Sequence, residues 1–482
     1  MKLKIKTSWW VYAGIIVFII LNSVGILKEF YLFNIIPFFL LLVAIAFLSL
    51  DALILIIVFF VPLSVPLSEI VQGLPIDMNL PTEPFLAGVL LIFVLKLLHE
   101  RSFDKKILTH PVSVSIYLYL IWILVTTLSS TMPIVSLKIF LSRVWFIIAF
   151  YFLTTQLFKN KNNTTKYILL YSISLSIVVL YATFRIVKYG IFEEKIAYWA
   201  SNPFYKDHTI YGAMLAFYIP PLAAFVYYKK FSNPKRLLYL GILFILTIGL
   251  ISSYSRAAWI SIIVAFSIWA IIQLKIKFWV IATSFITFVI FIFLFGNTIM
   301  RTLESNDQDS SGNNISEQIQ SITNISTDAS NVERLNRWKC AIRMFKQKPI
   351  LGWGPGTYMF QYAPFQRSYE KTIISTNKGD GGNAHSEYLG PLCEQGILGP
   401  FFYLLIIIST IITASKVIRK TSDDFSRMMS ISAILGLVTY YLHGILNNFL
   451  NTDKAAAPFW GFIAIIVAID IYHKKKEQPT AE

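Results

Sequence analysis

Cysteine and charged residues are both scarce in this chain. Two cysteines, Cys340 and Cys393, occur among 482 residues, which excludes a disulfide-rich scaffold and a cysteine-based zinc cluster. Only 14% of the residues are charged, against about 25% in soluble domains. A soluble protein with a charged surface is therefore excluded, and the sequence leaves open whether the two cysteines form a disulfide bond outside the cytoplasm.

Motifs for nucleotide and metal binding are also missing. The chain has no Walker A motif, no dinucleotide fingerprint and no cluster of zinc ligands. Its formal net charge of +16 does not indicate nucleic acid as a partner, because basic residues gather in short loops between apolar runs, as they do on the cytoplasmic side of membrane proteins. The sequence predicts neither a metal nor a cofactor, so an enzyme built on it needs an already activated substrate.

Long apolar runs fill most of the chain. Hydrophobic residues make up 56% of it, and runs of about 20 such residues are typical of transmembrane helices. We therefore predict an all-α polytopic membrane protein embedded in the lipid bilayer. The fourteen predicted spans are 8–27, 30–49, 51–67, 84–99, 111–129, 134–157, 166–187, 209–228, 237–253, 257–274, 278–296, 397–414, 428–446 and 457–472.

The charges of the loops predict the orientation of these spans. Lysines precede the first run, no signal-peptide cleavage site follows it, and it is interpreted as the first span. Basic residues then recur in every second short loop, whereas loop 68–83 has three acids and no base. By the positive-inside rule, the number of spans is even and both termini are cytoplasmic.

This topology divides the chain into three parts. Residues 1–296 contain the first eleven spans, residues 297–396 form one large loop outside the cytoplasm, and residues 397–482 contain the last three spans and a cytoplasmic tail. A loop of about 100 residues between spans is typical of a functional region.

The charges of the large loop are segregated. Residues 304–333 contain six acids and no base, whereas residues 334–378 contain nine bases and one acid. Between them, Ser330 and Glu333 have the spacing of a helix capping box, and Pro349 would end the helix. We predict an amphipathic basic helix that lies on the outer membrane face. Its apolar stripe would be Leu335, Trp338, Ile342 and Phe345, and its bases would include Arg334, Arg337 and Arg343.

His385 is the first candidate for chemistry. The topology places only three of the six histidines on or near the outer side, His208, His385 and His443. A neutral imidazole can take a proton from a hydroxyl near pH 7, although a histidine can also simply cap the helix that follows it. Glu387 and Glu394 follow His385, and either can orient it or act as the base itself.

Arginines at apolar boundaries are the next candidates. Arg256 lies between two apolar runs, where a guanidinium can bind an exogenous phosphate or snorkel to lipid headgroups. Arg143 falls in mid-span, either as a buried structural residue or as a second phosphate ligand. Asp207 and His208 open a span at the outer face, where they can line a pocket or cap the helix.

Three motifs together resemble the O-antigen ligase family. They cover about residues 250–450 and occur in the family's order: Arg256 with Ile260 in place of the usual leucine, Arg334-x3-Trp338 followed by the run Pro349–Gly354, and His385-Ser386-x9-Gly396-x-x-Gly399. The family often has an acid near the outer end of the span after the histidine, where this chain has His443 and, further on, Asp453. The resemblance also implies twelve spans rather than fourteen.

The resemblance implies a GT-C-like fold in the bacterial inner membrane with an active site that faces the periplasm. Such enzymes transfer a glycan from undecaprenyl pyrophosphate to a sugar hydroxyl of the lipid A core, without metal or nucleotide. By this analogy His385, with Glu387 beside it, would deprotonate the acceptor hydroxyl. The residues that would bind the pyrophosphate are Arg256, Arg334, Arg337, Arg343 and Arg143.

Three other functions remain open. A Wzy-type polysaccharide polymerase shares the donor, and the ten-residue spacings from His385 to Gly396 and from Arg343 to Gly354 are found in polymerases. A protein O-oligosaccharyltransferase also shares the donor. A transporter of lipid-linked glycans would carry ionisable residues in mid-membrane and internal repeats; the candidate charges lie at the outer edge, which favours an enzyme.

Overall fold

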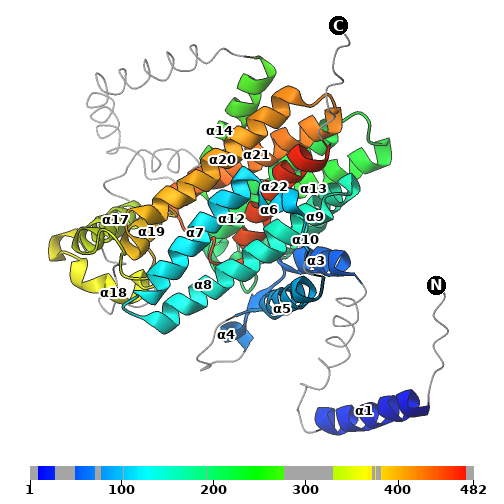
Figure 1. Ribbon diagram of the computed structural model, residues 1–482, viewed down its shortest axis with the longest axis horizontal. Helices are drawn as coiled ribbons and strands as arrows, with labels where there is room; N and C mark the ends of the chain where they lie inside the picture. Colours follow the sequence, from blue (N-terminus) through cyan, green and yellow to red (C-terminus); the bar gives the residue numbers. More distant parts are fainter. Residues whose placement is uncertain are drawn as a thin grey trace. The chain divides into compact units, whose positions relative to one another are not determined.

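The computed structural model describes residues 9–27, 49–70, 78–100, 102–190, 193–275, 329–371, 375 and 382–473. Almost all of its regular structure is helical (Figure 1). The chain divides into two compact units, Met1–Ile56 and Ile57–Glu482. The first unit contains α1 (Trp9–Leu27) and the start of α3 (Leu50–Phe60), and the second contains all the helices discussed below.

Ten helices of the second unit are long and apolar enough to cross a membrane. They are α5 (Thr82–Glu100), α7 (Pro111–Leu128), α8 (Pro133–Ile147) continued through a π-helical turn (Ile148–Leu153) into α9 (Thr154–Leu157), α10 (Lys161–Tyr189), α12 (His208–Tyr227), α13 (Asn233–Ser252), α14 (Arg256–Gln273), α20 (Leu398–Lys420), α21 (Asp424–Leu446) and α22 (Asp453–Ala468) continued through a second π-helical turn (Ile469–His473). The prediction of an all-α polytopic membrane protein is confirmed.

Shorter elements connect these helices. They are β1 (Val65–Pro66), α4 (Leu67–Ile70), β2 (Asn79–Leu80), α6 (Lys105–Leu108), α11 (Glu194–Ala200), α17 (Ala329–Gln347), α18 (Tyr358–Gln361), two 3-10 turns (Ala363–Phe365 and Ser368–Glu370) and α19 (Leu389–Gln395). The two strands pair antiparallel, with Val65 opposite Leu80 and Pro66 opposite Asn79.

Ten of the fourteen predicted spans coincide with these ten helices, and the predicted first span coincides with α1. The span predicted at 51–67 is wrong in its length, because α3 has only 11 residues and ends at Phe60. Pro62 lies just beyond that end; proline has no N–H to donate and is common shortly after a helix terminus. The spans predicted at 30–49 and 278–296 lie outside the described residues, apart from Ser49, which the structure describes without helix.

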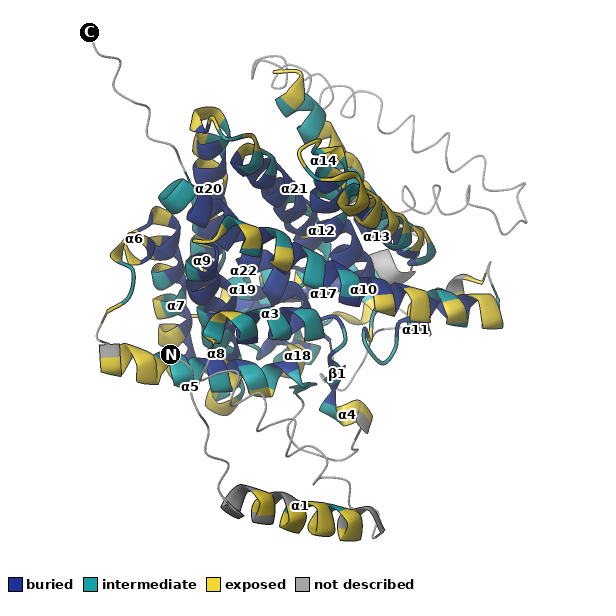
Figure 2. Ribbon diagram, turned by 90° about the vertical axis from the view of Figure 1, so that its right-hand side faces the viewer, coloured by how far each residue is buried: buried dark blue, intermediate teal, exposed yellow. Residues whose placement is uncertain are grey.

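The core of the second unit forms around α22, which is buried along its whole length. It packs against α21, α20 and the π-helical turn Ile148–Leu153, while α12 packs against α21. Figure 2 shows the dark blue of buried residues on α12, α21 and α22, and more exposed residues on α13 and α14. Small residues permit this close packing: a Cβ on Gly461 would lie 2.3 Å from the Tyr167 hydroxyl of α10.

Two buried charges fix the beginning of α22. The Asp453 carboxylate accepts hydrogen bonds from Ser64 at 2.8 Å, from Asn79 at 3.0 Å and from the Thr82 hydroxyl. The Lys454 ammonium donates to the carbonyl oxygens of Val61 and Ser64 at 3.1 and 2.8 Å. These bonds satisfy the buried charges and tie the short strands to the bundle.

The helices α17, α18 and α19 lie together at one end of the bundle (Figure 1). They share a small core of their own, in which α17 packs directly on α19. Its buried members are Cys340, Ala341, Met344, Tyr358, Tyr362, Ala384 and Cys393. Both cysteines are buried free thiols in this structure, so the possible disulfide bond is not formed.

A glycine turn joins α17 to α19. The backbone N–H of Gly354 donates to the Glu394 carbonyl at 2.7 Å, and that of Ile397 donates to the Pro349 carbonyl at 3.0 Å. Gly396 has a φ of 71°, and a Cβ on it would lie 1.9 Å from the carbonyl oxygen of Ile350. The glycine of the predicted motif is therefore needed because two backbone segments meet there.

We expect Gly396→Ala to lower the free energy of unfolding by about 3 kcal/mol or more, since alanine would add both left-handed strain and a backbone clash. Gly241→Ala is the matched control, because nothing lies within 4 Å of its Cβ position in α13. The melting temperatures of the two purified variants measure the difference. Equal melting temperatures would contradict this role of Gly396.

Candidate active site

The backbone around His385 is held by three hydrogen bonds. The Asn383 side-chain oxygen accepts from the His385 N–H at 2.9 Å, and the Trp338 indole donates to the His385 carbonyl at 3.3 Å. The Glu387 N–H donates to the Gly444 carbonyl of α21 at 2.7 Å. His385 has a φ of 47°, a conformation that costs about 1 kcal/mol or more for a residue other than glycine. Such strain is often found at functional sites.

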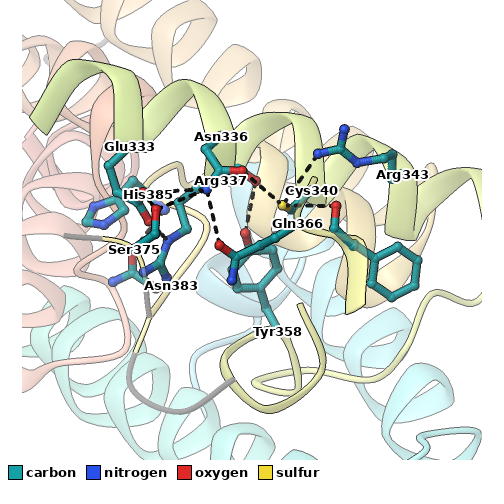
Figure 3. Close-up of polar contacts among 11 residues, drawn as sticks. Glu333, Asn336, Arg337, Cys340, Arg343, Tyr358, Gln366, Ser375, Asn383 and His385 are labelled. Carbon is teal, nitrogen blue, oxygen red and sulfur yellow. Dashed lines mark hydrogen bonds and ion pairs between the residues drawn. The ribbon is translucent and has the colours of Figure 1, made fainter. Parts of the chain in front are cut away.

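The pKa of His385 is lowered to about 4, so the ring is neutral at pH 7. Burial is the largest cause, and the positive charges of Arg334 and Arg337 add to it. Asp207 and Glu333 oppose the shift. The neutral ring can accept a proton, and it lies within the electric field of Arg334 and Arg337. Figure 3 shows the His385 ring together with Arg337 and Glu333 of α17.

Two of the three candidate arginines on α17 are paired with acids. Arg337 Nε lies 2.6 Å from Glu333 Oε1, both side chains are buried, and the guanidinium lies 4.4 Å from the Tyr362 ring centroid. Arg343 lies 2.5 Å from Glu370. Arg343 is also nine residues beyond Arg334, about 14 Å along the helix. Each of these arginines therefore has an acidic partner within the domain, and the phosphate-binding role that the resemblance implied for them stays a prediction.

The apolar stripe predicted for α17 does not coincide with the face that α17 buries against protein. Ile342 is 40% exposed, and the buried face is formed instead by Glu333, Asn336, Arg337, Cys340, Ala341 and Met344. This face packs on protein, since its apolar members join the core shared with α19. Its polar members bond to protein too: Asn336 contacts Gln366 and Ser375 (Figure 3). The helix α17 is thus part of a small folded domain that it forms with α18 and α19.

Asp207 and His208 lie where α12 begins. The Asp207 carboxylate accepts from the Thr209 N–H at 2.7 Å and so caps the helix, as one of the two predictions had it. The His208 ring lies 4.5 Å from the Tyr198 ring, centroid to centroid. Asp207 nevertheless acts electrostatically on His385, so the end of α12 belongs to the same site.

Arg256 is the first residue of α14, directly after Ser255 at the N-cap. The turn before it includes Tyr254, whose φ is 49°. A Cβ on Gly212 of α12 would lie 2.5 Å from Ser255 Cβ, so this turn packs tightly on the first turns of α12. Because Gly212 is in the second turn of α12 and Ser255 is the N-cap of α14, the two helices that His208 and Arg256 open begin close together.

Glu387 and Arg143 hold the segment that follows α21. Glu387 is 4% exposed, and its Oε1 accepts from the Tyr440 hydroxyl at 2.7 Å and from the N–H groups of Phe449 and Leu450 at 2.6 and 2.8 Å. The buried Arg143 donates to the Leu450 carbonyl at 3.1 Å and to the Asn451 side chain at 2.7 Å. Arg143 is therefore buried with structural partners, as one of its two predictions had it.

We expect Glu387→Gln to keep activity within about tenfold of wild type while lowering the free energy of unfolding by about 1–3 kcal/mol, because the amide weakens a buried hydrogen-bonded charge. Activity assays and melting temperatures on the same preparation separate the two effects. A stable Glu387→Gln variant without activity would instead indicate that Glu387 is the base.

Glu394 is also placed away from His385. Its carboxylate accepts from the Tyr358 N–H at 3.1 Å, and burial raises its pKa to about 7. It holds the first turn of α18 next to the glycine turn. The structure therefore gives both acids that follow His385 partners other than its imidazole.

His443 stands near the outer end of its span, where the resemblance implies an acid, and no role was predicted for it from the sequence. It lies in the last turn of α21, is 1% exposed, and the ionisable groups that act on it include Asp207, Arg334 and His208. Two signals in the sequence marked it: a histidine at the predicted outer end of a span, and its place where the resemblance implies an acid. Within the described residues, no group of three or more histidine, cysteine, aspartate or glutamate side chains could hold a metal ion.

Comparison with known proteins identifies one region of the chain. Residues 241–404 match the family model described as O-antigen ligase. This region contains Arg256, Arg334, His385 and the two glycines of the predicted motif, but not His208 or His443. No curated protein matches the chain.

Proposed function

We propose that this chain, which carries the O-antigen ligase domain at residues 241–404, transfers a glycan from undecaprenyl pyrophosphate to a sugar hydroxyl of the lipid A core. The domain itself supports a function of the O-antigen ligase or polymerase type at the membrane. The observation that carries the finer proposal is the neutral His385 ring beside Arg334, at the end of a bundle of membrane-spanning helices.

In the proposed reaction, His385 removes the proton from the acceptor hydroxyl as its oxygen attacks the anomeric carbon of the donor sugar. The bond from that carbon to the pyrophosphate oxygen breaks, and the electron pair leaves with the pyrophosphate. Arg334 and Arg256 stabilise the charge that develops there. A positioned general base contributes about 10²- to 10⁴-fold to such a reaction.

The donor's chemistry agrees with the location of these groups. A lipid carrier holds its pyrophosphate at the membrane boundary, where Arg256 opens a span. The sugar–pyrophosphate bond is already activated, so the proposed transfer uses neither a nucleotide nor a metal. In the orientation we propose, this end of the bundle faces the periplasm from the bacterial inner membrane, residues 297–396 form the periplasmic loop, and both termini are cytoplasmic.

We expect the pH profiles of kcat/KM and kcat to differ on the acid side. In the free enzyme the His385 pKa is lowered from 6.5 to about 4, so kcat/KM should fall only below about pH 4, where the ring becomes protonated. A bound pyrophosphate offsets Arg334 and raises the pKa of the base. The acid limb of kcat should therefore lie at higher pH than that of kcat/KM. Coincident limbs would contradict this electrostatic coupling.

Deleting the protein from its host and separating the surface glycolipids on a gel tests the function. Loss of a ligase leaves bare lipid A core, with the long glycan stranded on its carrier. Core that carries a single repeat unit would indicate a Wzy-type polymerase instead. An unchanged pattern would contradict both and direct the search to a protein acceptor.

A further inference from the structure

His443 carries a buried nitrogen for which the described part of the chain supplies no partner. The ring is 1% exposed, and its Nδ1 atom has no hydrogen-bond partner among the described residues. Its Nε2 atom lies 3.2 Å from the side-chain nitrogen of Asn447. Because an amide nitrogen can only donate, Nε2 is the acceptor, and in the neutral ring the hydrogen is on Nδ1. His443 therefore presents an unused N–H donor in a buried place.

This donor lies beside the proposed active site. The neighbouring residue, Gly444, accepts a hydrogen bond from the backbone N–H of Glu387 at 2.7 Å, two residues after His385. The Tyr388 hydroxyl also donates to the Tyr441 carbonyl at 3.0 Å. The His385 loop is thus bonded directly to the last turn of α21.

One guanidinium and one carboxylate act on the His443 ring, and the guanidinium is the group that can hold an anion there. Arg334, Asp207 and His208 are the ionisable groups that act on its ring, and Arg334 and Asp207 also act on His385. An unpaired buried donor is costly, and native structures usually satisfy such groups. A phosphate oxygen held by Arg334 would supply the missing acceptor.

We propose that His443 donates a hydrogen bond from Nδ1 to a phosphate oxygen of the lipid-linked donor, an assignment that rests on the proposed function. His443 belongs to a membrane span, so it lies near the level at which a lipid carries its phosphates, whereas His385 lies in the loop outside. The two histidines then have separate roles. His443 binds the leaving group and His385 activates the acceptor.

Substituting His443 by asparagine or by glutamine distinguishes the roles of its two ring nitrogens. The side-chain nitrogen of asparagine is as far from the backbone as Nδ1 of histidine. The side-chain nitrogen of glutamine takes about the position of Nε2. Loss of a hydrogen bond to a charged group weakens binding by about tenfold or more. We therefore expect His443→Asn to bind undecaprenyl pyrophosphate within about threefold of wild type, and His443→Gln to lose about tenfold or more.

The probe is undecaprenyl pyrophosphate itself, and its binding to the purified full chain in nanodiscs is measured by competition with a fluorescent analogue. Thr439→Val is the matched control, because the Thr439 hydroxyl, one turn earlier in α21, is satisfied by the Gly436 carbonyl at 2.7 Å. It should bind as wild type does. Equal affinity in His443→Asn and His443→Gln, whether kept or lost, would overturn the proposal.

A second readout observes the hydrogen bond in the wild-type protein and uses one variant only to assign the signal. In wild-type protein labelled with ¹⁵N-histidine, the lipid should move one Nδ1–H signal downfield, and that signal should be absent from His443→Asn. Binding without this shift would overturn the role of His443 while leaving the proposed function intact. Failure of the wild-type chain to bind the lipid at all would instead contradict the proposed function.

Discussion

His385→Asn should lower the proposed glycan transfer by about 10²- to 10⁴-fold, the range that a positioned general base contributes. Asparagine tests the side chain more selectively than alanine does, because it tolerates the positive φ of 47° at this position and so preserves the backbone. Its amide can form hydrogen bonds but cannot accept the proton. The loss should therefore appear in kcat, with the melting temperature close to that of wild type.

Two controls sharpen this prediction. His99→Ala removes an exposed imidazole at the end of α5 and should leave transfer unchanged. Added imidazole should restore part of the activity to His385→Ala, where the side-chain space is open. If a folded His385→Asn variant keeps transfer within tenfold of wild type, His385 is not the base.

Arg334 is the second residue with a large expected effect. Arg334→Ala should lower kcat/KM by about 10³-fold, and Arg334→Lys by about 10²-fold, because lysine keeps the charge but loses the bidentate fork that fits a phosphate. The charge of Arg334 also lowers the pKa of His385. The acid limb of kcat/KM should therefore move to higher pH in Arg334→Ala and stay in place in Arg334→Lys.

Lys346→Ala is the control for Arg334, because Lys346 is an exposed base on the same helix. It should change neither kcat/KM nor the pH profile. A pH profile that is unchanged in Arg334→Ala would show that Arg334 and His385 act independently. A wild-type value of kcat/KM in Arg334→Ala would show that Arg334 does not bind the donor.

The sequence predicted the spans well because an apolar run of about 20 residues has few other stable structures. It also predicted where α17 lies, since the Ser330–Glu333 spacing and Pro349 are local signals. The buried face of α17 could not be predicted in the same way. It is determined by Tyr358, Tyr362 and Cys393, which reach the helix only in the folded domain.

The same distinction between local and long-range information holds for the site. The position of His385 after a glycine-rich turn was visible in the sequence, whereas the partners of the arginines were not. Arg143 bonds to Leu450, 307 residues away, and Arg343 bonds to Glu370 across a loop. His443 enters the site because α21 packs beside the His385 loop, which no spacing in the sequence reveals.

Reconstitution with purified components tests the central claim most directly. The full chain in liposomes, given an undecaprenyl-pyrophosphate-linked glycan, an acceptor with the lipid A core and a metal chelator, should elongate the acceptor and release undecaprenyl pyrophosphate in equal amounts. His385→Asn, assayed in parallel, should release almost none. Failure of the wild-type chain to transfer glycan, or equal transfer by the variant, would contradict the account.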